Sequence, residues 1–415
     1  MPHSPVRASS RIDDVRYEIR GELARRAAEL ETEGRVIAKL NIGNPGLFGF
    51  GVSDHVRSAI EKNLGRSEAY CHQKGIESAR VAIVEQMHAH GVAAAHVDRV
   101  FIGNGVSELI DLALRALLNA GDEVLLPSPD YPLWSAATIL NGGRPVYYPC
   151  PATRAHLPDA DEIEALITPR TRAIVVINPN NPTGAVYPRA LLDALVRVAE
   201  KHRLIVLSDE IYDEILYDGA EFTPLARLTG DVPCLTFDGL SKAQRACGYR
   251  VGWLSLTGAP GELGHIEHAL DLLASLRLCA NVPGQWAIAP SLQGEDTISP
   301  LTVRGGRLYE SRQAVIDHCA QSRFLDVVAP QGALYAFPSV RPGVIPNFDD
   351  DRFALELLEH ASVLVVPGSG FNLTARNHFR VTLLPYADQL RDVFLRIEAV
   401  LQTMTESAVP QRHVA

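Results

Sequence analysis

The sequence predicts an α/β fold with two domains, a large one built on a mostly parallel sheet between helices and a smaller α+β one. Helical and strand patterns alternate from about residue 53 to about residue 294, as in a chain of βαβ units. After Pro300 the pattern changes to helices separated by short strands. A chain of 415 residues is long for one hydrophobic core, so two domains are expected, and its 47% of apolar residues is enough for a large buried sheet.

The large domain is predicted over residues 50–298. Its clearest elements are apolar runs typical of buried strands at Val100–Ile102, Ala173–Ile177 and Leu204–Leu207, and an apolar helix at Leu109–Leu118. The smaller domain is predicted over residues 299–405. Its expected elements are helices at Leu301–Cys319, Asp351–His360 and from about Tyr386, and strands at Leu325–Val328, Leu334–Phe337, Val363–Val366 and Phe379–Leu383.

Composition indicates a cytoplasmic enzyme. The net charge of −10 and the lack of a basic stripe argue against nucleic acid as a partner. The six cysteines lie far apart without a C-x-x-C pair, which is typical of reduced thiols and not of disulfides or a zinc site. The first residues contain no apolar signal region, and no apolar stretch approaches the ~20 residues needed to span a membrane.

A lysine and an arginine close together give the first indication of chemistry. Lys242 lies among small residues, and Arg250 follows it by eight positions. The lysine amine can form a Schiff base with an aldehyde, and the guanidinium can bind a phosphate with two donors. The pair fits a carbonyl cofactor that carries a phosphate, although most lysines are simply solvated surface charges.

Two polar segments follow predicted strands. Asn178–Gly184 comes after Ala173–Ile177, and a simple turn would need fewer of its seven residues. Asp209 and Tyr212 come after Leu204–Leu207, at the strand end where open α/β sheets bind ligands. A carboxylate there can keep a pyridine nitrogen protonated, although Asp209 as a helix N-cap is an equal alternative on this segment alone.

A glycine-rich segment, Gly103–Glu108, leads from a strand into a helix and predicts a phosphate site at the helix N-terminus. A dinucleotide site is the alternative. Glu108 stands where the third glycine of that fingerprint belongs, and no suitably placed acid follows about twenty residues later, so we favour the simple phosphate site.

Together these segments resemble the fold type I pyridoxal-phosphate aminotransferases of class I and II, over about Ile12 to Val400. Asn41–Pro45, Ser128–Trp134 and Arg277–Cys279 are similar to one bacterial branch, the glutamate–pyruvate (alanine) aminotransferases. The resemblance implies a seven-stranded type of sheet. It also adds residues 12–49, with a helix at Ile12–Glu33, to the smaller domain. Residues 1–11 and 406–415 are expected to be flexible termini.

The resemblance also implies roles for individual residues. Lys242 would hold pyridoxal 5'-phosphate as a Schiff base and transfer the substrate proton, with Asp209 and Tyr212 completing the catalytic set. The expected cofactor-binding residues are Gly105, Val106, Ser107, Tyr131, Asn181, Asp209, Tyr212, Ser241, Lys242, Arg250 and Tyr70. Tyr70 would reach the phosphate of a neighbouring subunit, which implies a homodimer with shared active sites.

The substrate site is expected to contain Gly43, Asn181 and Arg380, with Arg380 binding the α-carboxylate through two donors. The implied reaction converts alanine and 2-oxoglutarate to pyruvate and glutamate. Arg277 is a candidate second cation by residue type only. Gly368–Ala375 departs from the branch, which carries a Trp-rich segment there, so the amino-acid specificity stays open.

Other functions remain as alternatives. A transaminase for aspartate, valine, an aromatic or a basic amino acid would share these motifs, and so would a pyridoxal-phosphate β-lyase or decarboxylase. A metal site is not expected, because His88 and His90 lack i, i+4 spacing. A serine hydrolase is not expected, because the sequence contains no G-x-S-x-G elbow. A ligand-sensing regulator would need a DNA-binding module, and only a short segment precedes Asn41.

Overall fold

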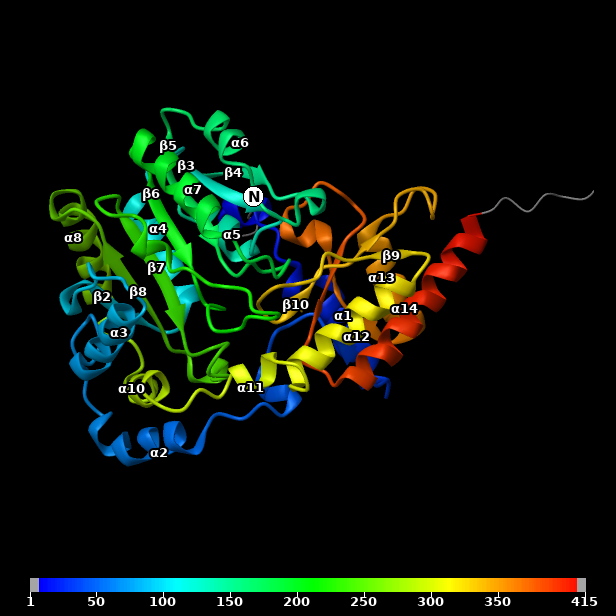
Figure 1. Cartoon of the computed structure of the whole chain (residues 1–415), viewed down its shortest axis with the longest axis horizontal. Coiled ribbons are helices and arrows are strands. Elements are labelled where there is room, and N and C mark those ends of the chain that lie inside the picture. Colours follow the sequence, from blue (N-terminus) through cyan, green and yellow to red (C-terminus); the bar gives the residue numbers. More distant parts are fainter. Residues whose placement is uncertain (1–6, 409–415) are drawn as a thin grey trace, which may run out of the picture.

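The computed structural model describes residues 7–408, in which one large sheet with its helices lies beside a smaller domain (Figure 1). The sheet has seven strands in the order β2-β8-β7-β6-β5-β3-β4, and β8 alone runs against the others. The predicted mostly parallel sheet is therefore confirmed. Its strands are β2 (Val100–Gly103), β3 (Glu123–Ser128), β4 (Arg144–Pro149), β5 (Thr171–Ile177), β6 (Ile205–Asp209), β7 (Cys234–Gly239) and β8 (Gly252–Thr257).

Helices cover both faces of this sheet, which explains why its central strands are apolar throughout. In β5, Ile174 and Val176 enter one core, and Ala173, Val175 and Ile177 enter the other, because successive side chains alternate. The first core is closed by α2 (Asp54–Asn63), α3 (Glu77–Ala89), α6 (Ala160–Ala165), α7 (Arg189–His202) and α10 (Ile288–Leu292). The second is closed by α4 (Val106–Leu117), α5 (Pro132–Leu140) and α8 (Pro260–Leu276).

The smaller domain has a separate core between three helices and short strands. Strand β14 (Phe379–Thr382) lies between β10 (Tyr335–Ala336) and β13 (Val366–Pro367). Two further pairs join β1 (Ala38–Lys39) to β12 (Val363–Leu364) and β9 (Leu325–Asp326) to β11 (Ser339–Val340). The helices are α1 (Glu22–Thr32), α12 (Arg307–Gln321), α13 (Asp350–Ala361) and α14 (Ala387–Ala408), and the short α9 (Val282–Gln285) and α11 (Ser299–Thr302) precede α12 in the chain.

Two predicted helices are interrupted. The helix expected at Leu301–Cys319 is wrong as one element, because Gly305 has φ +87° and separates α11 from α12. The helix expected at Ile12–Glu33 is also wrong. It is two 3₁₀ turns, η1 (Ser10–Asp14) and η2 (Glu18–Arg20), followed by α1. The chain is extended between the turns because Ile19 is buried against Phe337 and Phe371.

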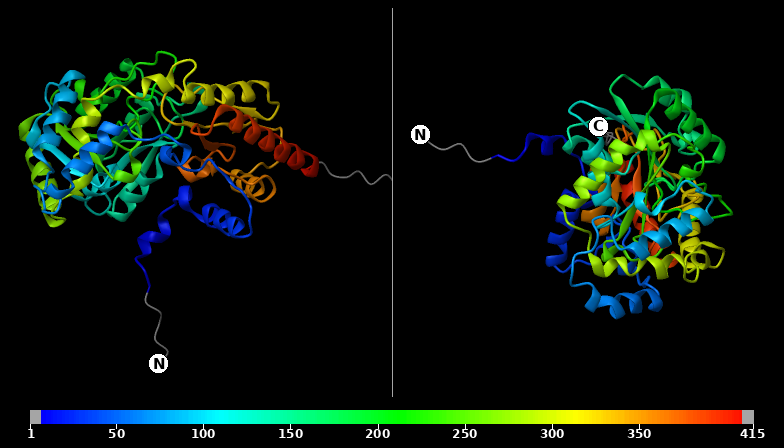
Figure 2. Two further views of the ribbon diagram at one scale, coloured as in Figure 1. Left: turned by 90° about the horizontal axis from the view of Figure 1, so that it is seen from below. Right: turned by 90° about the vertical axis from the view of Figure 1, so that its left-hand side faces the viewer.

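Two arginines of this first segment form ion pairs across the fold. Arg16 pairs with Asp351 at 3.0 Å, and Arg26 Nε pairs with Glu359 at 2.6 Å, so both tie the segment to α13. The chain enters at η1, on the outside of the molecule (Figure 2), where none of its residues is buried and Arg11 Nη1 donates to the Leu140 carbonyl at the end of α5 at 3.0 Å.

The ends of the chain are only partly described. The flexible termini were expected at residues 1–11 and 406–415, of which 1–6 and 409–415 lie outside the described residues. Within the described part, α14 continues to Ala408, beyond the predicted fraying after Thr405. The predicted domain boundaries at residues 50 and 298 stay a prediction.

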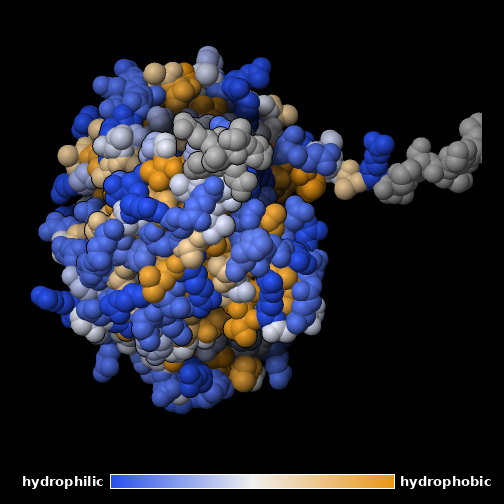
Figure 3. All heavy atoms as spheres, turned by 90° about the vertical axis from the view of Figure 1, so that its right-hand side faces the viewer, coloured by the Kyte–Doolittle hydropathy of each residue, from blue (hydrophilic) through white to orange (hydrophobic). Residues whose placement is uncertain are grey.

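The surface of the smaller domain is mostly hydrophilic, with scattered hydrophobic residues (Figure 3). On α14, Leu395 is 64% exposed, while the preceding Phe394 is fully buried. Among the helices of residues 7–408, none combines the length and apolar character needed to cross a membrane.

Phe394 and Leu395 allow a matched test of the smaller core. Phe394→Ala should lower the free energy of unfolding by about 3–5 kcal/mol, because it empties a well-packed position beside the His318 ring, 5.3 Å away. Leu395→Ala should change it by less than about 0.5 kcal/mol. Urea unfolding followed by circular dichroism measures both, and equal effects would contradict this packing.

Candidate active site

The motifs that follow separate strands converge at one edge of the sheet. Strands β5, β6 and β7 are parallel neighbours, with Ile177 opposite Asp209 and Asp209 opposite Phe237. Asn178 and Lys242 lie just beyond the carboxyl ends of β5 and β7. Because parallel strands end at a common edge, the loops that follow them border the same crevice, and Asn181, Asp209 and Lys242 line it.

This crevice is a cavity of about 640 Å³. It is large enough for a drug-sized ligand by the usual range of ~300–1,000 Å³. The predicted site residues that line it are Gly43, Val106, Ser107, Tyr131, Asn181, Asp209, Tyr212, Ser241, Lys242, Arg250 and Arg380. Gly105 contacts the Arg250 guanidinium at its rim, and Tyr70 does not line it.

Asp209 is a buried carboxylate with one oxygen free. It is 3% exposed, and Trp134 Nε1 donates to its Oδ2 at 3.0 Å. Its Oδ1 has no hydrogen-bond partner in the described chain, although the Ile211 backbone N–H lies near the carboxyl group and helps to lower its pKa. Burial raises the pKa of Asp209 to about 6, against the opposing effects of Trp134 and Lys242. The free oxygen can therefore accept a hydrogen bond from a protonated nitrogen of a ligand.

The alternative of Asp209 as a helix N-cap is wrong, because residues 211–214 form a turn and not a helix. Trp134 was noticed in the sequence only as part of a family motif. Its role in holding Asp209 depends on α5 packing against the sheet, where the Trp134 ring meets Phe237 edge-to-face at 5.2 Å. No local signal could have shown that contact.

Lys242 extends into the cavity from the loop after β7. Its Nζ donates to the Gly43 carbonyl at 2.9 Å and lies 5.9 Å from the centre of the Tyr212 ring. A neutral carbonyl is a weak partner for an ammonium, so this amine is positioned without being locked in an ion pair. That arrangement suits a lysine that reacts.

Tyr335 is a site residue that the sequence analysis missed. Its hydroxyl accepts a hydrogen bond from Tyr212 at 3.2 Å and occupies the space that a Cβ at Gly43 would need. Only glycine fits at position 43, because any side chain there would collide with the Tyr335 hydroxyl. Burial alone would raise the pKa of Tyr335, but Lys242 and Arg380 lower it below its usual value.

Arg380 is a buried cation without a carboxylate beside it among the described residues. It is 1% exposed on β14, the central strand of its sheet. Its Nη1 donates to Asn181 Oδ1 at 2.9 Å and its Nη2 to the Asn41 carbonyl, while Nε has no partner in the described chain. A buried, unneutralised guanidinium is costly, and this favours binding of an anion.

Aromatic rings hold the Arg380 guanidinium flat. Its central carbon lies 4.2 Å from the centre of the Tyr335 ring and 4.8 Å from that of Phe371. Such stacking fixes the plane of the donors, which is what bidentate recognition of a carboxylate requires.

The start of α4 and Arg250 form a cradle for an anion. Gly105, with φ +85°, precedes α4, and a side chain there would collide with the Arg250 guanidinium. A Cβ at Gly252 would come within 2.6 Å of the Val106 nitrogen. The first N–H groups of a helix lack internal partners, so they can bind a phosphate beside this guanidinium.

Glu108 explains why the third glycine of a dinucleotide fingerprint is missing. Its carboxylate accepts from the Asn104 backbone nitrogen at 2.6 Å and from Asn104 Nδ2 at 3.1 Å. Arg277 lies behind the same loop, donating to the Ile102 carbonyl at 2.7 Å with its Nε 3.6 Å from Glu108 Oε1. Arg277 does not line the cavity of its own chain, and its Nε and Nη1 have no hydrogen-bond partner in the described chain, so its role as a second cation stays a prediction.

The segment Gly368–Ala375, which departs from the family, also does not line the cavity. Its Asn372 Nδ2 donates to Asp130 Oδ1 at 3.0 Å and to Ser135 Oγ at 2.9 Å. These bonds join the segment to the loop that carries Tyr131. Burial raises the pKa of Asp130 to about 7, and the bonds from Asn372 and Ser135 oppose that rise.

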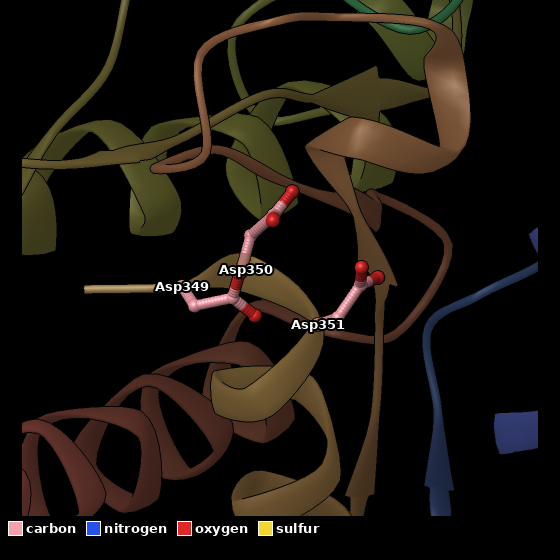
Figure 4. Close-up of side chains that lie close together, drawn as sticks. All are labelled: Asp349, Asp350 and Asp351. Carbon is pink, nitrogen blue, oxygen red and sulfur yellow. The ribbon is translucent and has the colours of Figure 1, made fainter. Parts of the chain in front are cut away.

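One cluster of carboxylates lies outside the cavity. Figure 4 shows Asp349, Asp350 and Asp351 at the start of α13, close enough together to suggest a metal site. However, Arg376 Nη2 lies 2.7 Å from Asp349 and 2.6 Å from Asp351, and Arg16 also pairs with Asp351. The arginines balance these charges, so the cluster is an ionic anchor for the amino-terminal segment.

Comparisons with known proteins agree with this geometry. The family model for aminotransferase class I and II matches residues 35–395. The glutamate–pyruvate aminotransferase AlaA of Escherichia coli (strain K12) is 47% identical over 93% of this chain and 96% of its own. An alanine aminotransferase of Mycobacterium bovis is 48% identical over 94% and 90%. A crystal structure of an E. coli aminotransferase superposes with a TM-score of 0.94 at 45% identity, over 96% and 99% of the two chains.

The raised pKa of Asp209 predicts a pH-dependent cost to stability when the site is empty. The folded carboxyl keeps its proton up to about pH 6, whereas the unfolded one releases it near 3.8, so folding loses stability as pH rises between these values. Asp209→Asn should therefore stabilise the cofactor-free protein, by roughly 1 kcal/mol more at pH 8 than at pH 5. Urea unfolding at both pH values checks this, and a gain independent of pH would contradict it.

Proposed function

Since this chain belongs to the class I and II aminotransferases, we propose that it transfers an amino group between L-alanine and 2-oxoglutarate, giving pyruvate and glutamate. The observation that carries the proposal is that Lys242, Asp209 and Arg380 line one cavity while lacking the partners their charges call for. Alanine is favoured because relatives at 47–48% identity over at least nine-tenths of both chains are named as glutamate–pyruvate and alanine aminotransferases.

Pyridoxal phosphate is the cofactor of this family, and the cavity fits it. When bound, it supplies an aldehyde that combines with amines and a ring that withdraws electrons. Asp209 would accept the ring N–H through its free Oδ1. The cradle at the start of α4, with Arg250 and Ser241, would hold the phosphate. Tyr131 would stack on the ring.

Asn181 and Tyr212 would bind the phenolic oxygen of the cofactor ring. The Oδ1 of Asn181 already accepts from Arg380, which leaves its amide nitrogen to donate into the cavity. Tyr212 is held by its hydroxyl contact with Tyr335 at 3.2 Å. Both residues come from loops at the carboxyl ends of neighbouring strands and line the same cavity.

Substrate binding and proton transfer fall to two cations. Arg380 would bind the α-carboxylate, which all amino acids and 2-oxo acids share, and this neutralises its buried charge. The amine of Lys242 would act as a base on the proton at the substrate Cα, and then as an acid that delivers this proton to the former aldehyde carbon of the cofactor. Its weak bond to the Gly43 carbonyl leaves it free to move between these positions.

We also propose that the enzyme works as a homodimer in the cytoplasm, with Tyr70 reaching the phosphate of the partner. Tyr70 is 77% exposed, and Leu272 and Leu276 near it are exposed as well. The two segments are joined by Gln73 Nε2, which donates to Asp271 at 3.1 Å. A cluster of exposed apolar side chains is typical of a contact surface. The six unpaired cysteines suit a reducing compartment.

Visible spectroscopy of the purified protein tests the reaction. Addition of L-alanine should convert the absorption band of the bound cofactor to that of its amine form, and 2-oxoglutarate should restore it. Lys242→Ala should slow this conversion by at least about 1,000-fold, whereas Lys201→Ala, an exposed control, should not. A band that alanine leaves unchanged would exclude alanine, and release of ammonia would indicate a lyase.

Mixing of two inactive variants tests the shared site. Dimers of Tyr70→Ala and of Lys242→Ala, once mixed and allowed to exchange subunits, should form hybrids with one site that retains both residues. We expect activity to rise above that of either parent. If hybrids form and activity does not recover, Tyr70 serves its own subunit or serves no site.

A further inference from the structure

Glutamate and 2-oxoglutarate carry a second carboxylate, and one cation of the cavity is left to bind it. The basic residues that line the cavity in the described chain are Arg20, Lys242, Arg250 and Arg380. Under the proposed function, Lys242 reacts with the cofactor, Arg250 binds its phosphate, and Arg380 binds the α-carboxylate of every substrate. We propose that the fourth, Arg20, binds the distal carboxylate and thereby admits dicarboxylates, an inference that rests on the proposed transaminase function.

Within residues 7–408, Arg20 has no side-chain partner, unlike Arg16 and Arg26, and Arg25, which also has none, does not line the cavity. Arg16 pairs with Asp351 at 3.0 Å and Arg26 pairs with Glu359 at 2.6 Å, in both cases across the fold. Within residues 7–408, the Arg20 guanidinium forms no hydrogen bond or ion pair, although it borders the cavity. Its donors are therefore available to a ligand.

The backbone that carries Arg20 is nevertheless fixed. Asn41 Nδ2 donates to the Ile19 carbonyl at 2.9 Å, and the Ile19 side chain is buried against Phe371. Arg16 Nη2 donates to Ser369 Oγ at 3.0 Å and to Asp351, a member of the aspartate cluster of Figure 4. These contacts hold η2 at the cavity, so only the Arg20 side chain needs to move to meet a ligand.

The exposure of Arg20 explains how one site can serve both alanine and glutamate. A buried cation such as Arg380 would be left without a counter-charge by a methyl side chain, at a large cost. The exposed Arg20 stays hydrated when alanine binds, because its long side chain can turn toward water. When a dicarboxylate binds, the planar guanidinium can donate two hydrogen bonds to its second carboxylate.

Two Arg20 variants, in the holoenzyme, test this assignment. In Arg20→Gln, the KM for glutamate and for 2-oxoglutarate should rise by about 10–100-fold, the loss expected of a charge-assisted contact. The KM for alanine should change by less than about threefold. Arg20→Lys should restore part of the difference, because it keeps the charge without the fork. Arg25→Gln removes an exposed arginine that does not line the cavity and should behave as the parent.

Equilibrium binding gives a readout that does not need turnover. Calorimetry should show that the parent holoenzyme binds glutarate more tightly than butyrate, and that Arg20→Gln removes this preference. Arg380→Gln should instead weaken both ligands. A preference for glutarate that survives in Arg20→Gln, or equal losses for alanine and glutamate, would overturn the assignment. A parent enzyme that uses neither alanine nor glutamate would overturn the proposed function first.

Discussion

The candidate site depends on the cost of burying charged groups without internal partners. Asp209 is 3% exposed with one oxygen free, and Arg380 is 1% exposed with no carboxylate beside it in the described chain. Both lie at one cavity, together with Lys242. A fold can keep such groups only where packing determines their positions, and here the seven-stranded sheet and its helices do so. The bound cofactor and substrate would supply the missing partners. The empty protein is therefore less stable than it could be, and the same groups raise its affinity for cofactor and substrate.

The site combines rigid and adjustable parts. Asp209, held by Trp134, and Arg380, stacked between Tyr335 and Phe371, are fixed by packing, and they would bind the groups that every substrate cycle shares. Arg20 is exposed on the anchored turn η2, and it would bind the distal carboxylate, which glutamate carries and alanine lacks. This division is consistent with an enzyme that must accept a methyl side chain in one half-reaction and a carboxylate in the other.

Much of the site could be predicted because its motifs are local. Asn178–Gly184 and the loop with Lys242 each follow an apolar strand, and parallel strands bring such loops together. Tyr335, Arg20 and the contact of Trp134 with Asp209 could not be predicted, because segments distant in the sequence supply them. The breaks near Gly305 and before η2 were missed for a related reason. The helical pattern of apolar residues continues through both breaks. The helix nevertheless ends there, because Gly305 has a positive φ and because Ile19 is buried in the core.

The protonation state of the cofactor ring nitrogen tests the role of Asp209 most directly. Nitrogen-15 NMR of the holoenzyme with labelled cofactor reports it. If the free Oδ1 of Asp209 accepts the ring N–H, the nitrogen should remain protonated at pH 8 in the parent and lose its proton in Asp209→Asn. An unprotonated ring nitrogen in the parent, or a protonated one that does not respond to this substitution, would contradict the role assigned to the buried carboxylate.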